Sequence, residues 1–312
     1  MSVFLLGENI EEVTSNRVVL SKVKIGTLYI VGTPIGNLED MTFRAVKTLQ
    51  SVDMIAAEDT RHTGKLLQHF QIKTPQLSYH EHNRNERLPE LLGLLNEGKA
   101  IALVTDAGMP GISDPGYELV KACTEAGVTV IPIPGATAGI TALTAAGLPT
   151  DRFVFEGFLP ASGQNRQKRL EFLAAESRTI ILYESPHRIQ QTLQDLANCF
   201  GKDRRIVLAR ELTKLHEEFW RGTIEDAIAH YTEREPKGEF TLVIAGKLPE
   251  IPVLSEEELK AELTKIMAQG ISRSQASRQL AQQTKLSRRE LYQLALALPA
   301  PSQTEAETLD ES

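Results

Sequence analysis

The sequence predicts an α/β protein with two α/β domains followed by a small helical domain. Three observations lead to this fold class. Short apolar runs alternate with stretches of helical spacing, several of which end at a glycine, and this order is typical of parallel β-α units. The alternation stops near residues 147–151 and then starts again. After Pro252 only helical stretches remain.

The first α/β domain is predicted from residue 25 to residue 148. Its strands are short apolar runs, as in a parallel sheet that is buried on both faces. They are expected at 27–32, 53–59, 100–108 and 128–133. Helices are expected at 43–52, 64–70, 87–98, 117–127 and 136–147. Residues 1–24 show weak periodicity and are expected to form a flexible extension.

The second α/β domain is predicted from residue 149 to residue 250. Its strands are expected at 152–158, 179–185, 205–211 and 239–246. Helices are expected at 165–177, 187–200 and 225–234. The repeated alternation predicts β-α units of the same parallel type as in the first domain.

The helical domain is predicted at residues 255–298. Its three helices are expected to begin at Ser255, Ser272 and Ser287, because serine is a preferred N-cap residue. Ser255 and Ser287 are each followed three residues later by a glutamate, which fits the capping box. Residues 299–312 are polar and acidic, so a disordered tail is expected there.

The composition is that of an ordinary globular protein, with 41% hydrophobic and 24% charged residues. This excludes a chain that is disordered throughout. The two cysteines do not form a disulfide framework or a metal-ligand spacing. The N-terminus lacks the basic and long apolar regions of a signal peptide, and no run is apolar enough to span a membrane. A cytoplasmic protein is therefore expected.

The charge is uneven along the chain. Lys and Arg number 34 against 41 Asp and Glu, which gives a net charge of −7 and by itself argues against nucleic-acid binding. Two segments are locally basic, however. Residues 270–298 carry five basic residues against one glutamate, and residues 163–170 carry three basic residues and no acid. Phosphate contact needs only local positive charge, although a solvated helix face would have the same composition.

Three loops that follow predicted strands are rich in glycine, proline and small residues. They cover residues 32–37, 105–116 and 132–139. Ligands bind at the carboxyl ends of parallel strands, and glycine lets the backbone approach them closely. The second loop is longer than the roughly two to six residues that a plain connection needs. None of the loops matches a dinucleotide-binding fingerprint or a P-loop. Together they predict one pocket.

A polar cluster follows the second predicted strand and includes Glu58, Asp59, Arg61, His62 and Lys65. It fits a substrate wall with acid–base and phosphate-binding groups, or alternatively a solvated helix cap with a charged face. The histidines of the chain lack metal-site spacing, so no metal is expected. Polar residues also follow strands of the second domain, at 183–188, 209–214 and 238–241.

Seven ordered segments carry a family resemblance. They are GTLYIVGTPIGNLEDMTFRA, EDTRHTGKLL, TDAGMPGISDPG, PIPGATA, YESPHR, ARELTK and GEFTLVIAG. This combination resembles the ribosomal RNA small-subunit methyltransferases of the tetrapyrrole (corrin/porphyrin) methylase superfamily, over about residues 24–298. The segment 105–108 stands where tetrapyrrole enzymes have Gly-Asp-Pro, which favours the rRNA branch.

The resemblance implies a tetrapyrrole-methylase-like fold, with a cleft between the two α/β domains that binds S-adenosyl-L-methionine. It places this cofactor at Pro34, Asp106, Gly108, Met109, Gly135, Thr137, Ala138, Tyr183, Glu184, Leu212 and Thr241. It further implies a homodimer that methylates the ribose 2′-oxygen of a cytidine in the decoding centre of 16S rRNA, within the small ribosomal subunit. The C-terminal helices resemble a helix-turn-helix-like domain, which is expected to help hold RNA and not DNA.

A 2′-hydroxyl is a weak nucleophile, so a nearby base would help the reaction. The carboxylates expected to serve are Glu58, Asp59 and Glu211. The cations expected to contact RNA are Arg61, Lys65, Arg166, Lys168, Arg169, Arg188, Arg273, Arg278, Arg288 and Arg289. Two alternatives stay open: a small-molecule tetrapyrrole methylase, or a nucleic-acid-binding regulator that senses S-adenosyl-L-methionine without turnover.

Overall fold

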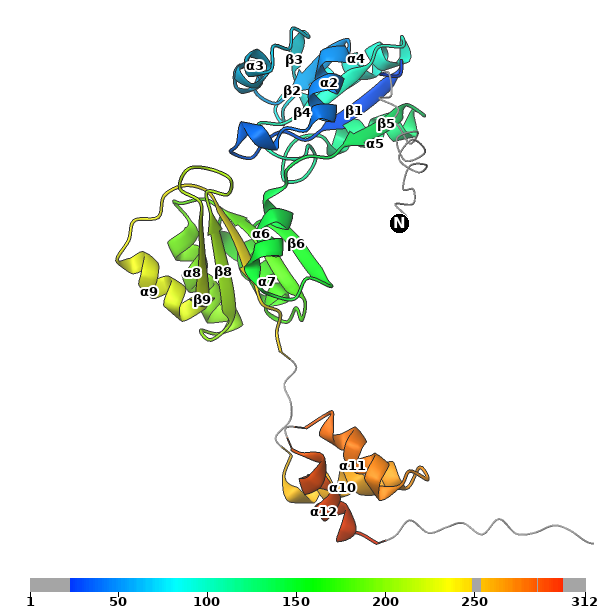
Figure 1. The fold of residues 1–312 in the computed structure, drawn as a ribbon, viewed down its shortest axis with the longest axis vertical. Coiled ribbons are helices and arrows are strands. Elements are labelled where there is room, and N and C mark those ends of the chain that lie inside the picture. Colours follow the sequence, from blue (N-terminus) through cyan, green and yellow to red (C-terminus); the bar gives the residue numbers. More distant parts are fainter. Residues whose placement is uncertain (1–22, 249–253, 285, 300–312) are drawn as a thin grey trace, which may run out of the picture. The chain divides into compact units, whose positions relative to one another are not determined.

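The computed structural model describes residues 23–248, 254–284 and 286–299. The described residues form two compact units, one that ends at residue 247 and one that begins at residue 248 (Figure 1). The predicted N-terminal extension and acidic tail lie, but for their innermost residues, outside the described part. Among the described residues, no helix combines the length and apolar character that crossing a bilayer requires.

The first sheet has five strands in the order β3-β2-β4-β1-β5, all of them parallel. These strands are β1 (Thr27–Val31), β2 (Met54–Ala57), β3 (Gln76–Ser78), β4 (Ile101–Val104) and β5 (Thr129–Ile133). The adjacent strands β1 and β4 connect onward in opposite directions across the sheet, the first to β2 and the second to β5. Such a switch point opens a crevice at the carboxyl ends of the strands.

Helices cover both faces of this sheet. They are α2 (Phe43–Ser51), α3 (Thr60–His69), α4 (Arg84–Asn96) and α5 (Tyr117–Glu125), with a short 3₁₀ helix η1 at Leu38–Asp40. Residues of α2 and α3 pack on one face, and residues of α4 and α5 pack on the other. Every residue of β1 and β4 is buried, which explains why both strands read as continuous apolar runs.

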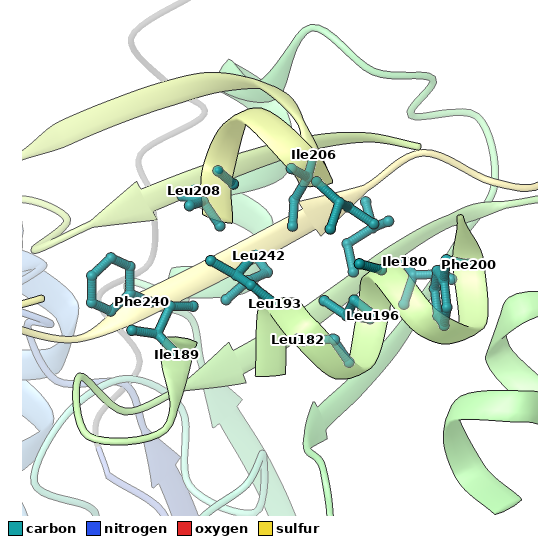
Figure 2. Packing of buried hydrophobic residues seen from close by; sticks show 14 of the residues in the cluster. Ile180, Leu182, Ile189, Leu193, Leu196, Phe200, Ile206, Leu208, Phe240 and Leu242 are labelled. Carbon is teal, nitrogen blue, oxygen red and sulfur yellow. The ribbon is translucent and has the colours of Figure 1, made fainter. Parts of the chain in front are cut away.

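The second sheet also has five strands, in the order β6-β7-β10-β8-β9. They are β6 (Phe153–Phe158), β7 (Thr179–Glu184), β8 (Arg205–Arg210), β9 (Glu218–Thr223) and β10 (Phe240–Ile244). One face packs against α7 (Gly163–Ala174), α8 (Ile189–Phe200) and α9 (Ile224–Thr232). Figure 2 shows this core, where Leu193 and Leu196 of α8 meet Leu242 of the central strand β10.

The opposite face of the second sheet packs against α6 (Ala138–Ala146). This helix was expected within the first domain, but Ala142 and Leu143 lie in one apolar cluster with Ile181 and Val243 of the second sheet. The segment from β5 to α6 therefore joins the two sheets. Both sheets belong to the compact unit that ends at residue 247. The predicted boundary between two α/β domains near residue 148 therefore stays a prediction.

Three features of the α/β part differ from the expectation. The pattern does not predict β3, a three-residue half-buried edge strand, or β9, an edge strand that is nowhere fully buried. The parallel arrangement holds for the first sheet, whereas in the second only β6 and β7 are parallel, and β10 runs antiparallel to both β7 and β8. Helix α3 begins at Thr60 because Asp59 caps it.

The C-terminal unit contains α10 (Glu256–Met267), α11 (Arg273–Ala281) and α12 (Arg288–Leu296). The predicted N-caps are confirmed: Ser255, Ser272 and Ser287 each accept a hydrogen bond from a backbone N–H three residues on. All three form capping boxes, including Ser272 with Gln275, which was not predicted. The helices enclose a small core that includes Leu263 and Leu291.

The central position of β10 predicts a large cost for removing one of its side chains. Leu242 is fully buried, so we expect Leu242→Ala to lower the free energy of unfolding by about 2–5 kcal/mol. The matched control is Leu215→Ala, because Leu215 is 92% exposed and its loss should cost under about 0.5 kcal/mol. Urea denaturation measures both values. Equal costs for the two variants would contradict the described packing.

Candidate functional site

A pocket of about 390 Å³ opens at the carboxyl ends of strands from both sheets, and we call it the first pocket. Its walls come from the loop after β4, the start of α6, and the ends of β6, β7 and β8. Apolar walls are supplied by Ile35, Phe158 and Leu212. The predicted convergence of strand-end loops thus forms a real cavity, of a size typical for small-molecule ligands.

Close contact between two glycines shapes the base of this region. A Cβ on Gly32 would lie 2.7 Å from the Cα of Gly135 and 2.7 Å from the Sδ of Met109. Such distances leave no room for a side chain, so the loops after β1 and β5 approach as closely as backbones can. Gly135 does not line the first pocket itself. It instead permits the approach that places Thr137 and Ala138 on the wall.

The loop after β4 is fixed to the loop after β1 by hydrogen bonds. Thr33 and Gly108 exchange backbone hydrogen bonds of 2.9 and 3.2 Å, and the Thr33 hydroxyl donates to the Thr105 carbonyl. Gly108 has a φ of 82°, a left-handed conformation that glycine adopts freely. These contacts present the backbone of residues 107–109 to the pocket.

Tyr183 links the second sheet to the start of α6. The backbone N–H of Gly139 donates a 3.1 Å hydrogen bond to the Tyr183 hydroxyl, and the edges of Phe155 and Phe158 pack on its ring. Burial raises the pKa of this phenol, so it stays protonated. The ring is therefore held as a rigid, uncharged wall of the first pocket.

A second hollow of about 500 Å³, the second pocket, adjoins the first. The two share Ile35, Ala107 and Glu239 as lining residues. Pro34 and Asp106 line the second pocket but not the first. The same holds for His62, Lys65 and Lys214, whose side chains carry or can accept a positive charge. The second pocket therefore offers cationic groups that the first pocket lacks.

The loop after β8 separates the two pockets and is strained. Glu211 and Thr213 have φ values of 52° and 65°, which residues with a side chain rarely adopt. Leu212, which lies between these two residues, lines the first pocket. Lys214, which follows Thr213, lines the second pocket. Strain of this kind concentrates at functional sites. A Cβ on Gly36 would collide with the Lys214 side chain, so the loop after β1 also closes tightly here.

Two glutamates hold the Lys214 ammonium group. Its Nζ donates to Glu211 at 2.9 Å and to Glu239 at 2.6 Å. Burial lowers the pKa of Lys214, but these two hydrogen bonds outweigh burial and the net pKa is raised. Lys214 therefore stays charged beside the second pocket. Glu211, expected as a catalytic group, lines neither pocket and serves to position Lys214 and the Glu239 backbone N–H.

Three acidic side chains lie in the segments that follow β2 and β4. Glu58 accepts a 3.2 Å hydrogen bond from the Asp106 backbone N–H. Burial raises the pKa of Glu58, the Asp106 N–H lowers it, and the Asp106 charge raises it again, for a net increase. Asp114 lines the first pocket, and burial together with the charges of Glu58 and Asp106 raises its pKa to about 7. Asp114 was not among the predicted site residues.

Asp59 is a structural cap in this arrangement. It accepts the Arg61 backbone N–H at 2.8 Å and binds the Arg61 guanidinium at 2.7 and 3.1 Å. The Arg61 side chain and backbone hold the pKa of Asp59 well below its usual range, so it is a weak proton acceptor. Glu58 and Asp59 line neither the first nor the second pocket, although the carboxylates were expected at the reacting centre.

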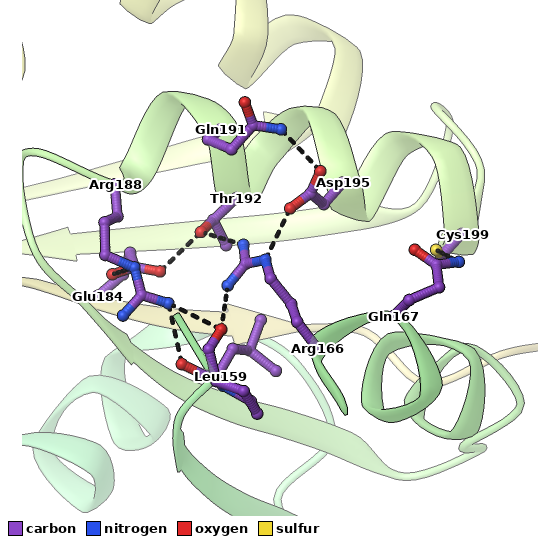
Figure 3. A network of polar contacts seen from close by, with 10 residues as sticks. Leu159, Arg166, Gln167, Glu184, Arg188, Gln191, Thr192, Asp195 and Cys199 are labelled. Atoms are coloured by element: carbon purple, nitrogen blue, oxygen red, sulfur yellow. Dashed lines mark hydrogen bonds and ion pairs between the residues drawn. The ribbon is translucent and has the colours of Figure 1, made fainter. Parts of the chain in front are cut away.

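Glu184 lines the first pocket and belongs to a polar network, which Figure 3 shows. It accepts from the Ser185 N–H and, at 2.6 Å, from the Thr192 hydroxyl, and Arg188 lies 3.5 Å away. The Arg188 guanidinium also donates to the Leu159 carbonyl at 2.9 Å. Glu184 and Arg188 thus mainly fix the end of β7 to its neighbours.

Arg166 belongs to the same network and is only 7% exposed. Its guanidinium donates to Asp195 at 2.8 Å, to Thr192 at 2.8 Å and to the Pro160 carbonyl at 3.0 Å (Figure 3). A buried guanidinium with these partners cannot reach a phosphate, so the expected RNA contact of Arg166 is disfavoured. The sequence shows a basic cluster at residues 163–170, but it does not reveal which arginine of a helix points inward.

The other expected RNA-contacting residues differ in availability. Arg169 pairs with Glu156, and Arg61 with Asp59, whereas Lys168 is exposed. In the C-terminal unit, Arg273 donates to the Leu298 carbonyl and Arg288 to the Ser274 hydroxyl. Arg278 and Arg289 are exposed and form no ion pair within the described residues.

Most of the predicted cofactor residues come together. Those that line the first pocket are Gly108, Met109, Thr137, Ala138, Tyr183, Glu184, Leu212 and Thr241. Pro34 and Asp106 line the second pocket instead. Lining residues that the prediction omitted include Ile35, Ile112, Ser113, Asp114, Phe158, Phe240 and Glu239. The long loop 105–116 could have pointed to Asp114, since it contains a second aspartate near its end.

Known proteins resemble this chain in sequence. The family model for Tetrapyrrole (Corrin/Porphyrin) Methylases matches residues 27–228. A Synechocystis protein named ribosomal RNA small subunit methyltransferase I is 66% identical over 277 residues, covering 88% of this chain and 99% of that protein. A Thermotoga maritima protein of the same name is 52% identical, covering 72% of this chain and all of that protein.

Solved structures resemble the chain more distantly. Uroporphyrin-III-C-methyltransferase from Thermus thermophilus has a TM-score of 0.52 at 22% identity, covering 70% of this chain and 94% of that one. Cobalt precorrin-4 methyltransferase has a TM-score of 0.52 at 22% identity, covering 70% and 95%. At this identity the likeness shows the fold.

The Gly32–Gly135 contact predicts that the pocket cannot tolerate a methyl group at its base. We expect Gly32→Ala to displace the loop after β5, because the new Cβ would meet backbone at 2.7 Å. Ligand affinity at the first pocket should then fall by at least tenfold, which a shift of about 1.4 kcal/mol would produce.

The control is Gly93→Ala, since Gly93 lies inside α4 and a Cβ there would have nothing within 4 Å. Alanine at this position should be neutral or stabilising. Calorimetric titration with S-adenosyl-L-homocysteine, together with thermal unfolding, measures both effects. Unchanged affinity in Gly32→Ala would contradict the role given to this contact.

Proposed function

The chain belongs to the tetrapyrrole (corrin/porphyrin) methylase family, and from this premise we propose that it is a methyltransferase acting on ribosomal RNA. The relatives named above supply the substrate class. In finer detail, we propose transfer from S-adenosyl-L-methionine to the ribose 2′-oxygen of a cytidine in the decoding centre of 16S rRNA. The substrate would be the small ribosomal subunit, and the enzyme would act in the cytoplasm as a homodimer.

The observation that carries the proposal is the fit of the first pocket to this cofactor. S-adenosyl-L-methionine has a flat adenine ring, a ribose and a sulfonium that gives it a net positive charge. Phe158, Tyr183 and Leu212 offer apolar surface for a ring. The backbone at residues 107–109 and 137–138 offers polar groups. No basic residue lines this pocket within the described part of the chain, which suits a cation.

When bound, S-adenosyl-L-methionine supplies a methyl group on a positively charged sulfur. The acceptor ribose would enter the second pocket, where Lys65, His62 and Lys214 can meet its phosphates. Ile35 and Ala107 line both pockets and would hold the acceptor oxygen next to the donor side. Positioning of this kind can contribute about 7–11 kcal/mol to the rate.

The proton of the ribose hydroxyl needs an acceptor, and Glu58, Asp59 and Glu211 were the expected carboxylates. The carboxylates that line the second pocket are instead Asp106 and Glu239, and Glu239 is engaged by Lys214. We therefore favour Asp106 as the proton acceptor. Glu58 would position it by holding the Asp106 backbone N–H.

Single-turnover methylation separates these roles. We expect Asp106→Asn to lower the rate by at least about 10²-fold, the usual contribution of a general base. Glu58→Gln should have a smaller effect, and the exposed Asp151→Asn should have none beyond about threefold. Rates for Asp106→Asn within threefold of wild type would contradict the assignment.

The decisive assay for the function uses tritiated S-adenosyl-L-methionine and small ribosomal subunits that lack the modification. Tritium in 16S rRNA at a ribose oxygen supports the proposal. Label on a tetrapyrrole precursor but not on RNA would favour the small-molecule alternative. Cofactor binding without any transfer would favour the regulatory alternative. Either of the last two results would overturn the proposed function.

We also propose that the C-terminal unit holds RNA through Arg278 and Arg289, which are exposed and free of ion pairs within the described residues. The double variant Arg278→Glu with Arg289→Glu should weaken binding to the small ribosomal subunit. The slope of log affinity against log salt concentration should become shallower by about two. Affinity for S-adenosyl-L-methionine should not change. The control is Lys265→Glu on α10, whose lysine already pairs with Glu262. Equal salt slopes for both variants would count against this contact.

A further inference from the structure

The acidic side chains of the first pocket differ in how their charge is balanced. Glu239 is paired with Lys214 at 2.6 Å, and Glu184 lies 3.5 Å from Arg188 and accepts the Thr192 hydroxyl. Asp114, the third, forms no ion pair within the described residues. Asp114 is thus the uncompensated carboxylate in the wall of this pocket.

Other acids crowd Asp114. Glu58 from the end of β2 and Asp106 from the end of β4 both face it, and neither forms an ion pair within the described residues. The remaining groups that face this cluster are the Thr105 hydroxyl and Tyr183, with His80 and Asp59 near Glu58, and Arg61 near Asp106. Burial and this repulsion raise the pKa of Asp114 to about 7. In the free protein Asp114 therefore carries a proton for much of the time at neutral pH.

The loop itself holds Asp114 in place. Ser113 has a φ of 62°, and a Cβ on Gly157 would lie 2.8 Å from the Ser113 hydroxyl. A Cβ on Gly116 would lie 2.9 Å from the Gly111 nitrogen. Residues 111–116 therefore form a closely packed turn, which fixes the backbone position of Asp114 at the pocket. A fixed charge at a partly desolvated wall acts strongly on a ligand charge.

We propose that Asp114 is the residue that distinguishes the positively charged methyl donor from the neutral product in the first pocket. Binding of the sulfonium would draw Asp114 into its ionised form, and the proton that it loses passes to solvent. Methyl transfer turns the sulfonium into a neutral thioether. The bound product therefore places one positive charge fewer beside Asp114 than the bound donor does. Asp114 then recovers a proton from solvent. The pocket would thereby favour the donor over the product. This inference rests on the proposed function.

Calorimetric titration in buffers of different ionisation enthalpy tests the inference directly. At pH 7 we expect S-adenosyl-L-methionine to release a fraction of a proton on binding, and S-adenosyl-L-homocysteine to release less. The affinity ratio of donor to product should rise between pH 6 and pH 8, because only ionised Asp114 attracts the extra charge. The α-amino groups of the two ligands also titrate, so the part of the pH dependence assigned to Asp114 is the part that the variant Asp114→Asn removes.

The variant Asp114→Asn should abolish the pH dependence of this ratio and lower it by about tenfold at pH 8, as the loss of one fixed charge would. Asp151→Asn, which changes an exposed carboxylate, should behave as wild type. A wild-type ratio that does not change with pH overturns the inference. An Asp114→Asn ratio equal to that of the wild type also overturns it. Failure of the wild type to bind either ligand would instead overturn the proposed function.

Discussion

Backbone contact between Gly32 and Gly135 is the constraint on which the candidate site depends. Gly32 directly follows β1 and Gly135 lies in the turn after β5, and the close approach of their backbones leaves no room for a side chain between them. The contact brings the start of α6 to the loop after β1. Since α6 packs on the second sheet, the same contact joins the two sheets around one pocket. The pocket is thus a consequence of topology as much as of the residues that line it.

Charge is divided between two adjacent hollows. The first pocket has only acidic charged residues, whereas the second is lined by Lys65 and Lys214 as well as by acids. A cationic cofactor and an anionic nucleic acid would each find a complementary surface on its own side of the wall formed by Ile35 and Ala107. The overall charge of −7 conceals this division, because it sums the acids of the first pocket, the cations of the second and the basic segment 270–298.

The strand-end loops, the first parallel sheet and the three capped C-terminal helices could be predicted from sequence because each depends on local chemistry. Buried parallel strands read as apolar runs, and serine caps act within one turn of helix. The antiparallel pairing of β10 could not be predicted, since the same apolar run suits either direction. Edge strands β3 and β9 are short or half-buried and lack a clear pattern. The roles of Arg166 and Asp114 depend on burial and on neighbours distant in sequence, which no local pattern encodes.

The central claim is that the cleft between the two sheets holds the methyl donor at the strand-end loops. A crystal structure of the complex with S-adenosyl-L-homocysteine tests it most directly. We expect the ligand in the first pocket, against the backbone of residues 107–109 and 137–138, with its sulfur facing the side shared with the second pocket. A ligand bound elsewhere on the chain, or in the second pocket, would contradict this claim.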